Sequence, residues 1–158
     1  MTDTTPTIVI VDDEEMVLTS LDSFLSLETD YNVHTFSSPA EALEFIRSND
    51  VHLVISDYLM PEMDGISLLA EVRQVKPDVT RIILTGYADK ENAIKAINEV
   101  GLFQYVEKPW DNEDLRIIIR NGLEKQELMR DLRDKIGEIE KAYGDLQKIQ
   151  QDILKTFA

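Results

Sequence analysis

The sequence predicts an α/β fold in which parallel β-strands alternate with amphipathic helices. Over the first two-thirds of the 158 residues, short apolar runs alternate with stretches that repeat apolar residues at helical spacing. The middle runs are continuously apolar, which is typical of parallel strands covered on both faces. The predicted strands are 7–11, 32–36, 51–56, 80–84 and 104–106. The predicted helices are 14–27, 39–48, 65–74, 90–99 and 111 onward.

Residues that satisfy free backbone groups mark several helix boundaries. Ser38, Pro39 and Glu41 place a cap, a first-turn proline and a capping-box glutamate in the order that starts a helix. Asp111 is in position to cap the last helix. No proline follows Pro109, so we expect that helix to continue toward the end of the sequence.

The charge of the chain is concentrated in its first part. The chain has 31 acidic and 16 basic residues, with a formal net charge of -15. Residues 124–158 hold eight acids and seven bases, which leaves 23 acids and nine bases in residues 1–123. Such a surface repels the phosphates of nucleic acids and anionic membranes. We therefore expect no direct nucleic-acid binding and no membrane binding.

Other features indicate an intracellular protein. There is no cysteine, which fits a reducing compartment. Residues 1–6 have neither a basic start nor an apolar stretch, so they do not form a signal peptide. No apolar run approaches the roughly 18 residues that span a bilayer. The predicted location is the cytoplasm.

Four of the predicted strands end in residues that can handle a phosphoryl group. These are Asp12 and Asp13 after the first strand, Asp57 after the third, Thr85 after the fourth and Lys108 after the fifth. The carboxyl ends of parallel strands meet at one edge of the sheet, where open α/β folds bind their ligands. We expect three carboxylates, a hydroxyl and an ammonium to share one cleft.

The three aspartates predict a magnesium site. Two carboxylates about 4 Å apart repel by about 4 kcal/mol at an effective dielectric constant of 20, so a cluster of three requires a cation. Oxygen ligands suit Mg²⁺ better than zinc, and His34 and His52 lack the spacing of a zinc pair. Taken singly, Asp12 and Asp13 fit a helix cap, and Asp57 fits a cap or a turn.

Asp57 is the best candidate nucleophile, because a carboxylate can form an aspartyl phosphate. Lys108 offers a fixed positive charge and Thr85 a hydroxyl donor for phosphoryl oxygens. The plain alternative for Lys108 is a solvated surface lysine. The bond before Pro109 is one of the few peptide bonds that readily adopt the cis form.

Four segments of the chain resemble the receiver domains of two-component response regulators. They are Val9-Ile10-Val11-Asp12-Asp13-Glu14, Asp57-Tyr58-Leu59-Met60-Pro61-Glu62-Met63-Asp64-Gly65, Thr85-Gly86-Tyr87-Ala88-Asp89 and Tyr105-Val106-Glu107-Lys108-Pro109-Trp110. Their order and spacing extend the resemblance over roughly residues 7–122. The resemblance implies a flavodoxin-like, five-stranded parallel sheet in the order 2-1-3-4-5, flanked by five helices, and a phosphoprotein that acts in signal transduction.

The resemblance also assigns roles at the acidic site. Asp57 would accept the phosphoryl group from a phosphohistidine on a sensor histidine kinase or a phosphotransfer protein. Asp13 and Asp57 would bind Mg²⁺ directly, Asp12 would bind it through water, and the backbone carbonyl of Leu59 would complete the protein ligands. Lys108 and Thr85 would hold the phosphoryl oxygens. No residue of the family pattern is missing, so we expect a competent acceptor that is not an enzyme beyond its own phosphorylation and dephosphorylation.

The resemblance implies switch or tuning roles for four residues. Thr85 and Tyr105 occupy switch positions, so the surface of helices 90–99 and 111 onward is expected to change and to transmit the signal to the last helix. Leu59 and Tyr87 lie two residues after Asp57 and Thr85, where the family tunes hydrolysis. Both are large and orient water poorly, so we expect slow autodephosphorylation.

The sequence after residue 122 changes to a heptad pattern. The a positions are Met129, Ile136, Tyr143, Gln150 and Phe157, and the d positions are Leu132, Ile139, Leu146 and Ile153. We call these nine positions the seam; eight are apolar, which favours a parallel dimeric coiled coil. The alternative is one amphipathic helix folded back on its own domain. Gly137 and Gly144 fall at b positions, where they weaken the helix but face solvent.

The predicted organisation is a receiver domain at 1–122 and an extended helix at 123–158 leading to an absent output domain, unless the helix itself is the output. Two other functions are considered. A Mg²⁺-dependent phosphatase with an aspartate nucleophile would need a second acid two residues after it, and that position holds Leu59. A coiled-coil adaptor would leave the acidic cleft inactive.

Overall fold

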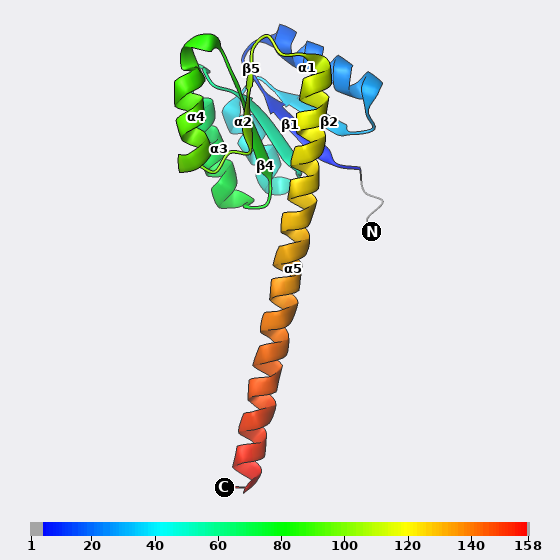
Figure 1. Cartoon of the computed structure of the whole chain (residues 1–158), viewed down its shortest axis with the longest axis vertical. Helices are drawn as coiled ribbons and strands as arrows, with labels where there is room; N and C mark the ends of the chain where they lie inside the picture. The colour runs from blue at the N-terminus through cyan, green and yellow to red at the C-terminus, as the bar shows by residue number, and fades with distance from the viewer. Residues whose placement is uncertain (1–4, 158) are drawn as a thin grey trace. The chain divides into compact units, whose positions relative to one another are not determined.

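The computed structural model describes residues 5–157, except the side chains of Tyr87 and Phe157. Five parallel strands form one sheet in the order β2-β1-β3-β4-β5, and Figure 1 shows this sheet among the helices. The strands are β1 (Thr7–Val11), β2 (Asn32–Phe36), β3 (Leu53–Asp57), β4 (Thr80–Thr85) and β5 (Gln104–Glu107). The predicted flavodoxin-like topology is confirmed.

Five α-helices and one 3₁₀ turn connect and follow the strands. They are α1 (Glu15–Glu28), α2 (Pro39–Ser48), α3 (Gly65–Val75), η1 (Tyr87–Asp89), α4 (Lys90–Glu99) and α5 (Asn112–Phe157). Every predicted element is present, with ends shifted by at most two residues. The largest shift is at β3, which begins at Leu53, because the His52 ring accepts the Thr7 amide at 3.0 Å in place of a ladder carbonyl.

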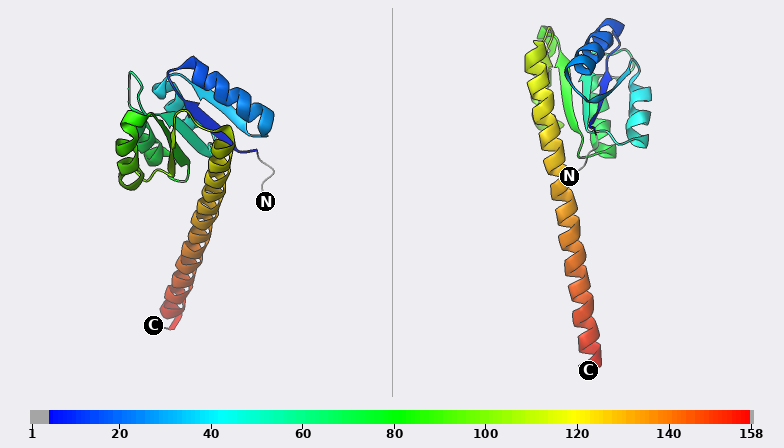
Figure 2. Two further views of the ribbon diagram at one scale, coloured as in Figure 1. Left: turned by 45° about the horizontal axis from the view of Figure 1, so that its top comes forward. Right: turned by 90° about the vertical axis from the view of Figure 1, so that its right-hand side faces the viewer.

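Both faces of the sheet are buried. Val9, Val54 and Ile83 point to the side covered by α2, α3 and α4. Ile8 and Ile55 point to the side covered by α1 and the first part of α5. Figure 2 shows these helices on the two faces of the sheet. The continuously apolar strands of the sequence therefore form the middle layer of a three-layer domain.

The amino ends of the central strands hold a buried cation. Arg81, at the start of β4, is only 5% exposed. Its guanidinium donates to the carbonyl of Leu69 at 3.0 Å and to that of Gly101 at 2.8 Å. Burial, and then the charge of Arg73, lower the pKa of Arg81 to about 10. Among the described residues, its hydrogen-bond acceptors are backbone carbonyls and not carboxylates, and its Nε has no partner.

Helix α5 lies against the start of β4 at Gly122. The buried Thr80 hydroxyl donates to the Gly122 carbonyl at 2.7 Å. A Cβ at position 122 would lie 3.0 Å from side-chain atoms of both Leu53 and Thr80, so glycine allows this close approach. The ammonium of Lys125 lies 5.5 Å from the ring centre of Phe103, one strand further along the sheet. These contacts fix the end of the helix that belongs to the domain.

The chain forms two compact units, one ending at Gln126 and the other beginning at Glu127. The second unit is helical through residue 157, as predicted for an extended last helix. The apolar seam side chains from Met129 to Ile153 are between 45% and 67% exposed. Among the residues that the structure describes, no helix is long and apolar enough to cross a membrane.

Candidate functional site

The acidic site lies at the carboxyl ends of β1 and β3. Asp12 follows β1 directly, and Asp57 is the last residue of β3. One carboxylate oxygen from each of Asp12, Asp13 and Asp57 lies within 4.8 Å of the other two. Asp12 is fully buried and Asp57 is 7% exposed, whereas Asp13 is exposed. The three predicted metal ligands therefore converge, with an opening on the side of Asp13.

Lys108 enters the same site from the end of β5. Its ammonium lies 3.0 Å from Asp57 Oδ1 and 3.1 Å from Asp12 Oδ2. The alternative of a solvated lysine is wrong, because the two nearly buried carboxylates hold its charge inside the site. The peptide bond between Lys108 and Pro109 is cis, as the sequence allowed.

Burial and mutual repulsion make the carboxylates difficult to ionise. Burial raises the pKa of Asp12, and the charge of Asp57 raises it further against the hydrogen bond from Glu14 and the nearby Lys108. Burial also raises the pKa of Asp57, although Lys108 opposes this shift. Burial lowers the pKa of Lys108, but its bonds to Asp57 and Asp12 outweigh that effect and raise it overall. One ammonium faces three carboxylates, so a divalent cation fits the charge and the oxygen donors of this site.

The aspartates also have the local roles that were considered as alternatives. Asp12 Oδ1 accepts the amide of Glu14 at 2.9 Å, just before α1. Asp57 Oδ1 accepts the amide of Tyr58 at 2.9 Å. These bonds orient the carboxylates: Asp12 keeps Oδ2 for Lys108, whereas Asp57 Oδ1 also accepts from Lys108. Capping and metal binding are therefore compatible at these positions.

Thr85 ends β4 beside the site but bonds elsewhere. Its hydroxyl donates to the Gly86 carbonyl at 3.1 Å, and its own carbonyl accepts the Lys108 amide at 2.9 Å. The second bond joins the ends of β4 and β5, so Thr85 and Lys108 are held next to each other along the sheet edge. The structure thus places the Thr85 backbone at the site, with its hydroxyl engaged outside the carboxylate cluster.

The remaining predicted residues lie around this edge. Tyr105, in β5, is half-buried and packs against the core that α4 covers. Leu59, in the loop after β3, has a side chain that is 61% exposed. Tyr87 lies in the turn before α4, and its side chain is outside the described part of the structure. Their switch, tuning and ligand roles stay predictions.

Gly65 is a site residue to which the sequence reasoning gave no role. A Cβ built on it would lie 2.1 Å from the backbone oxygen of Asp57, so only glycine fits. Its amide donates to the Tyr58 carbonyl at 2.8 Å. The start of α3 is therefore pressed against the strand end that carries the candidate nucleophile. The Asp64-Gly65 pair at a helix start was the available signal, but it does not show which backbone group lies opposite.

The comparisons agree with this geometry. The family described as the response regulator receiver domain matches residues 8–120. Among curated proteins, the chain is 35% identical over 132 residues to the hydrogenase transcriptional regulatory protein HoxA of Cupriavidus necator, covering 84% of this chain but 27% of HoxA. It is 29% identical over 155 residues to the response regulator protein TodT of Pseudomonas putida, covering 98% of this chain and 67% of TodT.

Solved structures show the same fold. The signal receiver domain of an HD domain-containing protein from Pseudomonas fluorescens is 40% identical, with a TM-score of 0.74 over 78% of this chain and 98% of that one. A structure described as adenylate cyclase from Rhodopirellula baltica is 29% identical, with a TM-score of 0.79 over 84% of this chain and 98% of that one. With five parallel strands in the expected order and a family match that spans most of its length, the chain belongs to the response regulator receiver domain family and is a phosphorylation-dependent signalling switch of a two-component system.

Proposed function

We propose that Asp57 accepts a phosphoryl group, with Mg²⁺, from a phosphohistidine on a sensor histidine kinase or phosphotransfer protein. The convergence of three carboxylates with the Lys108 ammonium at one sheet edge carries this proposal. Asp12 and Asp13 would hold the cation together with Asp57 and the Leu59 carbonyl. The cation would neutralise phosphoryl charge on one side, and Lys108 would do so on the other.

The hydrogen bonds at Asp57 indicate which oxygen reacts. Lys108 and the Tyr58 amide both donate to Oδ1. Oδ2 then attacks phosphorus, the phosphorus–nitrogen bond to the donor histidine breaks, and the histidine nitrogen keeps the electron pair. The product is an aspartyl phosphate, whose new oxygens meet Lys108 and the bound cation.

Thr85 and Tyr105 would convert this reaction into a change of surface. The Thr85 hydroxyl would exchange the Gly86 carbonyl for a phosphoryl oxygen, which is a stronger, charge-assisted acceptor. Tyr105, half-buried in the neighbouring strand, would turn further inward behind it. The ion pair between Lys90 and Glu107, at 3.6 Å, joins α4 to β5 and would shift with them. The signal would pass through this surface to α5.

The test is phosphorylation by a small acyl phosphate in Mg²⁺, followed by intact mass spectrometry. Wild type is expected to gain one phosphoryl group, and Asp57→Asn is expected to gain none. Asp22→Asn is the control, because Asp22 lies on the exposed face of α1 and bonds only to Ser26 in the described structure. Modification of Asp57→Asn equal to that of wild type would exclude Asp57 as the acceptor.

The two alternative functions, a phosphatase and an inactive adaptor, predict results that differ from those of a phosphoryl acceptor. A phosphatase would need an acid where Leu59 stands, so turnover of phosphate esters is expected to be absent. An inactive adaptor would not respond to beryllofluoride with Mg²⁺. A working acceptor would bind beryllofluoride and change its own conformation. The relatives named as transcriptional regulators are much longer than this chain, so the absence of nucleic-acid binding stays a prediction, as does the cytoplasmic location.

A further inference from the structure

We propose that residues 127–157 are an interface between two copies of this chain, joined as a parallel, in-register, two-stranded coiled coil that Gln150 aligns. The observations that carry this are independent of the acidic site. The apolar seam residues from Met129 to Ile153 are exposed, and they recur every three and four residues along this helical unit. That face is a narrow a/d stripe, which is the width that one partner helix covers.

Gln150 decides the orientation and the register of the two helices. It is the single polar residue among the nine seam positions, and its side chain is exposed in the single chain. In a parallel, in-register pair it meets its own copy, so one amide donates to the other. In an antiparallel or shifted pair it would face an apolar residue and lose those bonds, which disfavours such pairs.

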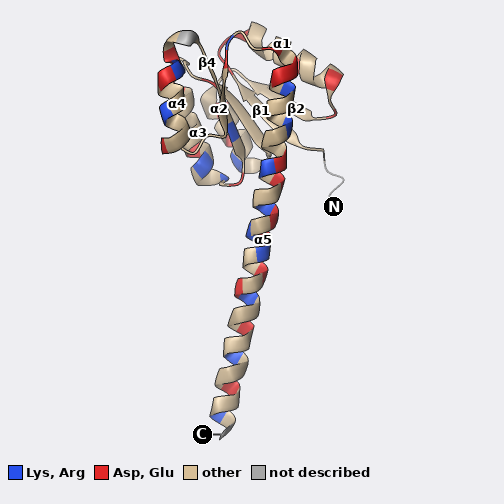
Figure 3. Ribbon diagram, in the orientation of Figure 1, with Lys and Arg blue, Asp and Glu red and all other residues tan. Residues whose placement is uncertain are grey.

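The positions that flank the seam match the same arrangement. In a parallel pair, each g position faces the e position of the following heptad on the partner helix. Lys135 at g would face Glu140 of the second copy, which pairs opposite charges. Ile149 at g would face Leu154 of the second copy, which pairs two exposed apolar side chains beside the Gln150 layer. Figure 3 shows that acidic and basic residues are interspersed along this part of α5, so no block of like charge opposes pairing.

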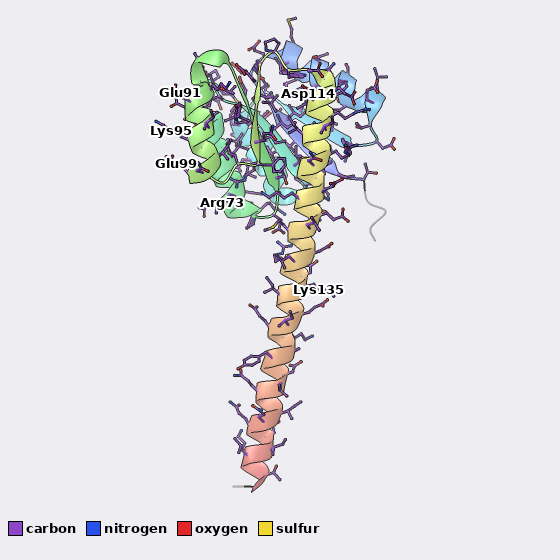
Figure 4. The ribbon with its side chains drawn as sticks, in the orientation of Figure 1. Arg73, Glu91, Lys95, Glu99, Asp114 and Lys135 are labelled. Carbon is purple, nitrogen blue, oxygen red and sulfur yellow. The ribbon has the colours of Figure 1, made fainter. Side chains whose placement is uncertain are left out.

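Lys135 has a competing contact within its own helix. Its ammonium lies 3.5 Å from Glu138, and both side chains are more than two-thirds exposed. Figure 4 shows Lys135 extending away from the helix axis. A pair this exposed contributes little by itself, so Lys135 remains able to reach Glu140 of a second copy. Glu138, at c, points away from the seam and provides an internal control.

Cysteine crosslinking tests the orientation in the full chain, which has no cysteine of its own. Leu132→Cys and Leu146→Cys, made separately, are each expected to form a disulfide-linked dimer under mild oxidation. Asp134→Cys, at an outward f position, is the matched control and is expected to remain largely monomeric on a denaturing gel. Crosslinking at Asp134 equal to that at Leu132, or none at Leu132 and Leu146, would overturn the proposal.

Light scattering and charge reversal test the partner and the register. The chain is expected to have the mass of a dimer, and the mass of a monomer or a trimer at micromolar concentration would overturn the proposal.

Glu140→Lys is expected to weaken the dimer about 3–10-fold, and adding Lys135→Glu is expected to restore it, whereas Glu138→Lys has a smaller effect. Gln150→Leu is expected to strengthen association while admitting crosslinks out of register, such as that between Leu146→Cys and Ile153→Cys chains.

Discussion

Charge is buried at both ends of the strands of the sheet. We call these ends the amino edge and the carboxyl edge, and they stabilise their buried charge in different ways. At the amino edge, Arg81 gives its protons to the carbonyls of Leu69 and Gly101, which belong to the chain itself. At the carboxyl edge, Asp12 and Asp57 share the ammonium of Lys108, and the carboxylate of Asp13 lies beside theirs. At the first edge backbone carbonyls accept from both terminal nitrogens of the buried guanidinium, although its Nε has no hydrogen-bond partner in the described structure, and the second edge has an excess of negative charge. We therefore assign the amino edge to the stability of the fold, and we propose that the carboxyl edge receives a cation and a phosphoryl group.

The largest expected effect comes from forcing the carboxyl edge apart at Gly65. Gly65→Ala would place a methyl group 2.1 Å from the Asp57 backbone oxygen, so α3 or the end of β3 must move. We expect a loss of about 3 kcal/mol or more in unfolding free energy and a marked loss of phosphorylation. Urea unfolding and mass spectrometry would measure the two effects.

Gly86→Ala is the matched control, because nothing lies within 4 Å of a Cβ at that position. We expect its unfolding free energy to stay within about 0.5 kcal/mol of wild type. Equal stability of the two variants would show that α3 does not press on Asp57 in solution.

The next largest effect tests the amino edge. Arg81→Met would remove the buried cation and its hydrogen bonds to the Leu69 and Gly101 carbonyls. We expect a loss of about 2–4 kcal/mol in unfolding free energy, with phosphorylation of Asp57 retained in the folded fraction. Arg73→Ala is the control, since Arg73 is exposed and makes one bond of 3.2 Å to the Val100 carbonyl. A loss of phosphorylation as large as that of Gly65→Ala would contradict the division of roles between the edges.

These two edges also show what the sequence could and could not predict. The aspartates and Lys108 were found because each follows an apolar run, and parallel strands bring their carboxyl ends together. Arg81 was placed in a strand, but its burial could not be predicted. Its acceptors, Leu69 and Gly101, are 12 and 20 residues away and become neighbours only when the helices pack. Gly65 was missed for the same reason, since a clash depends on packing and not on residue pattern.

Removing charge from the carboxyl edge should stabilise the protein when Mg²⁺ is absent. Burial raises the pKa of Asp57, so the folded protein binds that proton more tightly than the unfolded chain. As pH rises from the ordinary value of 3.8 through the raised value, wild type loses stability that Asp57→Asn keeps. In EDTA at neutral pH we expect the variant to be the more stable of the two.

Thermal unfolding from pH 4 to pH 7, with EDTA or with Mg²⁺, would measure this difference. Added Mg²⁺ is expected to stabilise wild type and reduce the advantage of Asp57→Asn, because the cation neutralises the carboxylates. An Asp57→Asn variant less stable than wild type in EDTA at every pH would show that the Lys108 ion pair outweighs the repulsion.

The smallest expected effects are those of replacing three glycines of helix α5 by alanine. Gly122 belongs to the amino edge, where a Cβ would lie 3.0 Å from Leu53 and Thr80 atoms, whereas nothing lies within 4 Å of a Cβ at Gly137 or Gly144. Alanine favours a helix over glycine by about 0.8–1.0 kcal/mol at each site. Gly137→Ala and Gly144→Ala should therefore increase the helicity measured by circular dichroism. Alanine raises the helix propensity at these positions, and no neighbouring atom crowds the added methyl group. Gly122→Ala should lower the unfolding free energy by about 1 kcal/mol, since crowding at β4 exceeds the helical gain. If Gly122→Ala were the most stabilising of the three, the close contact between α5 and β4 would not be a constraint on residue 122.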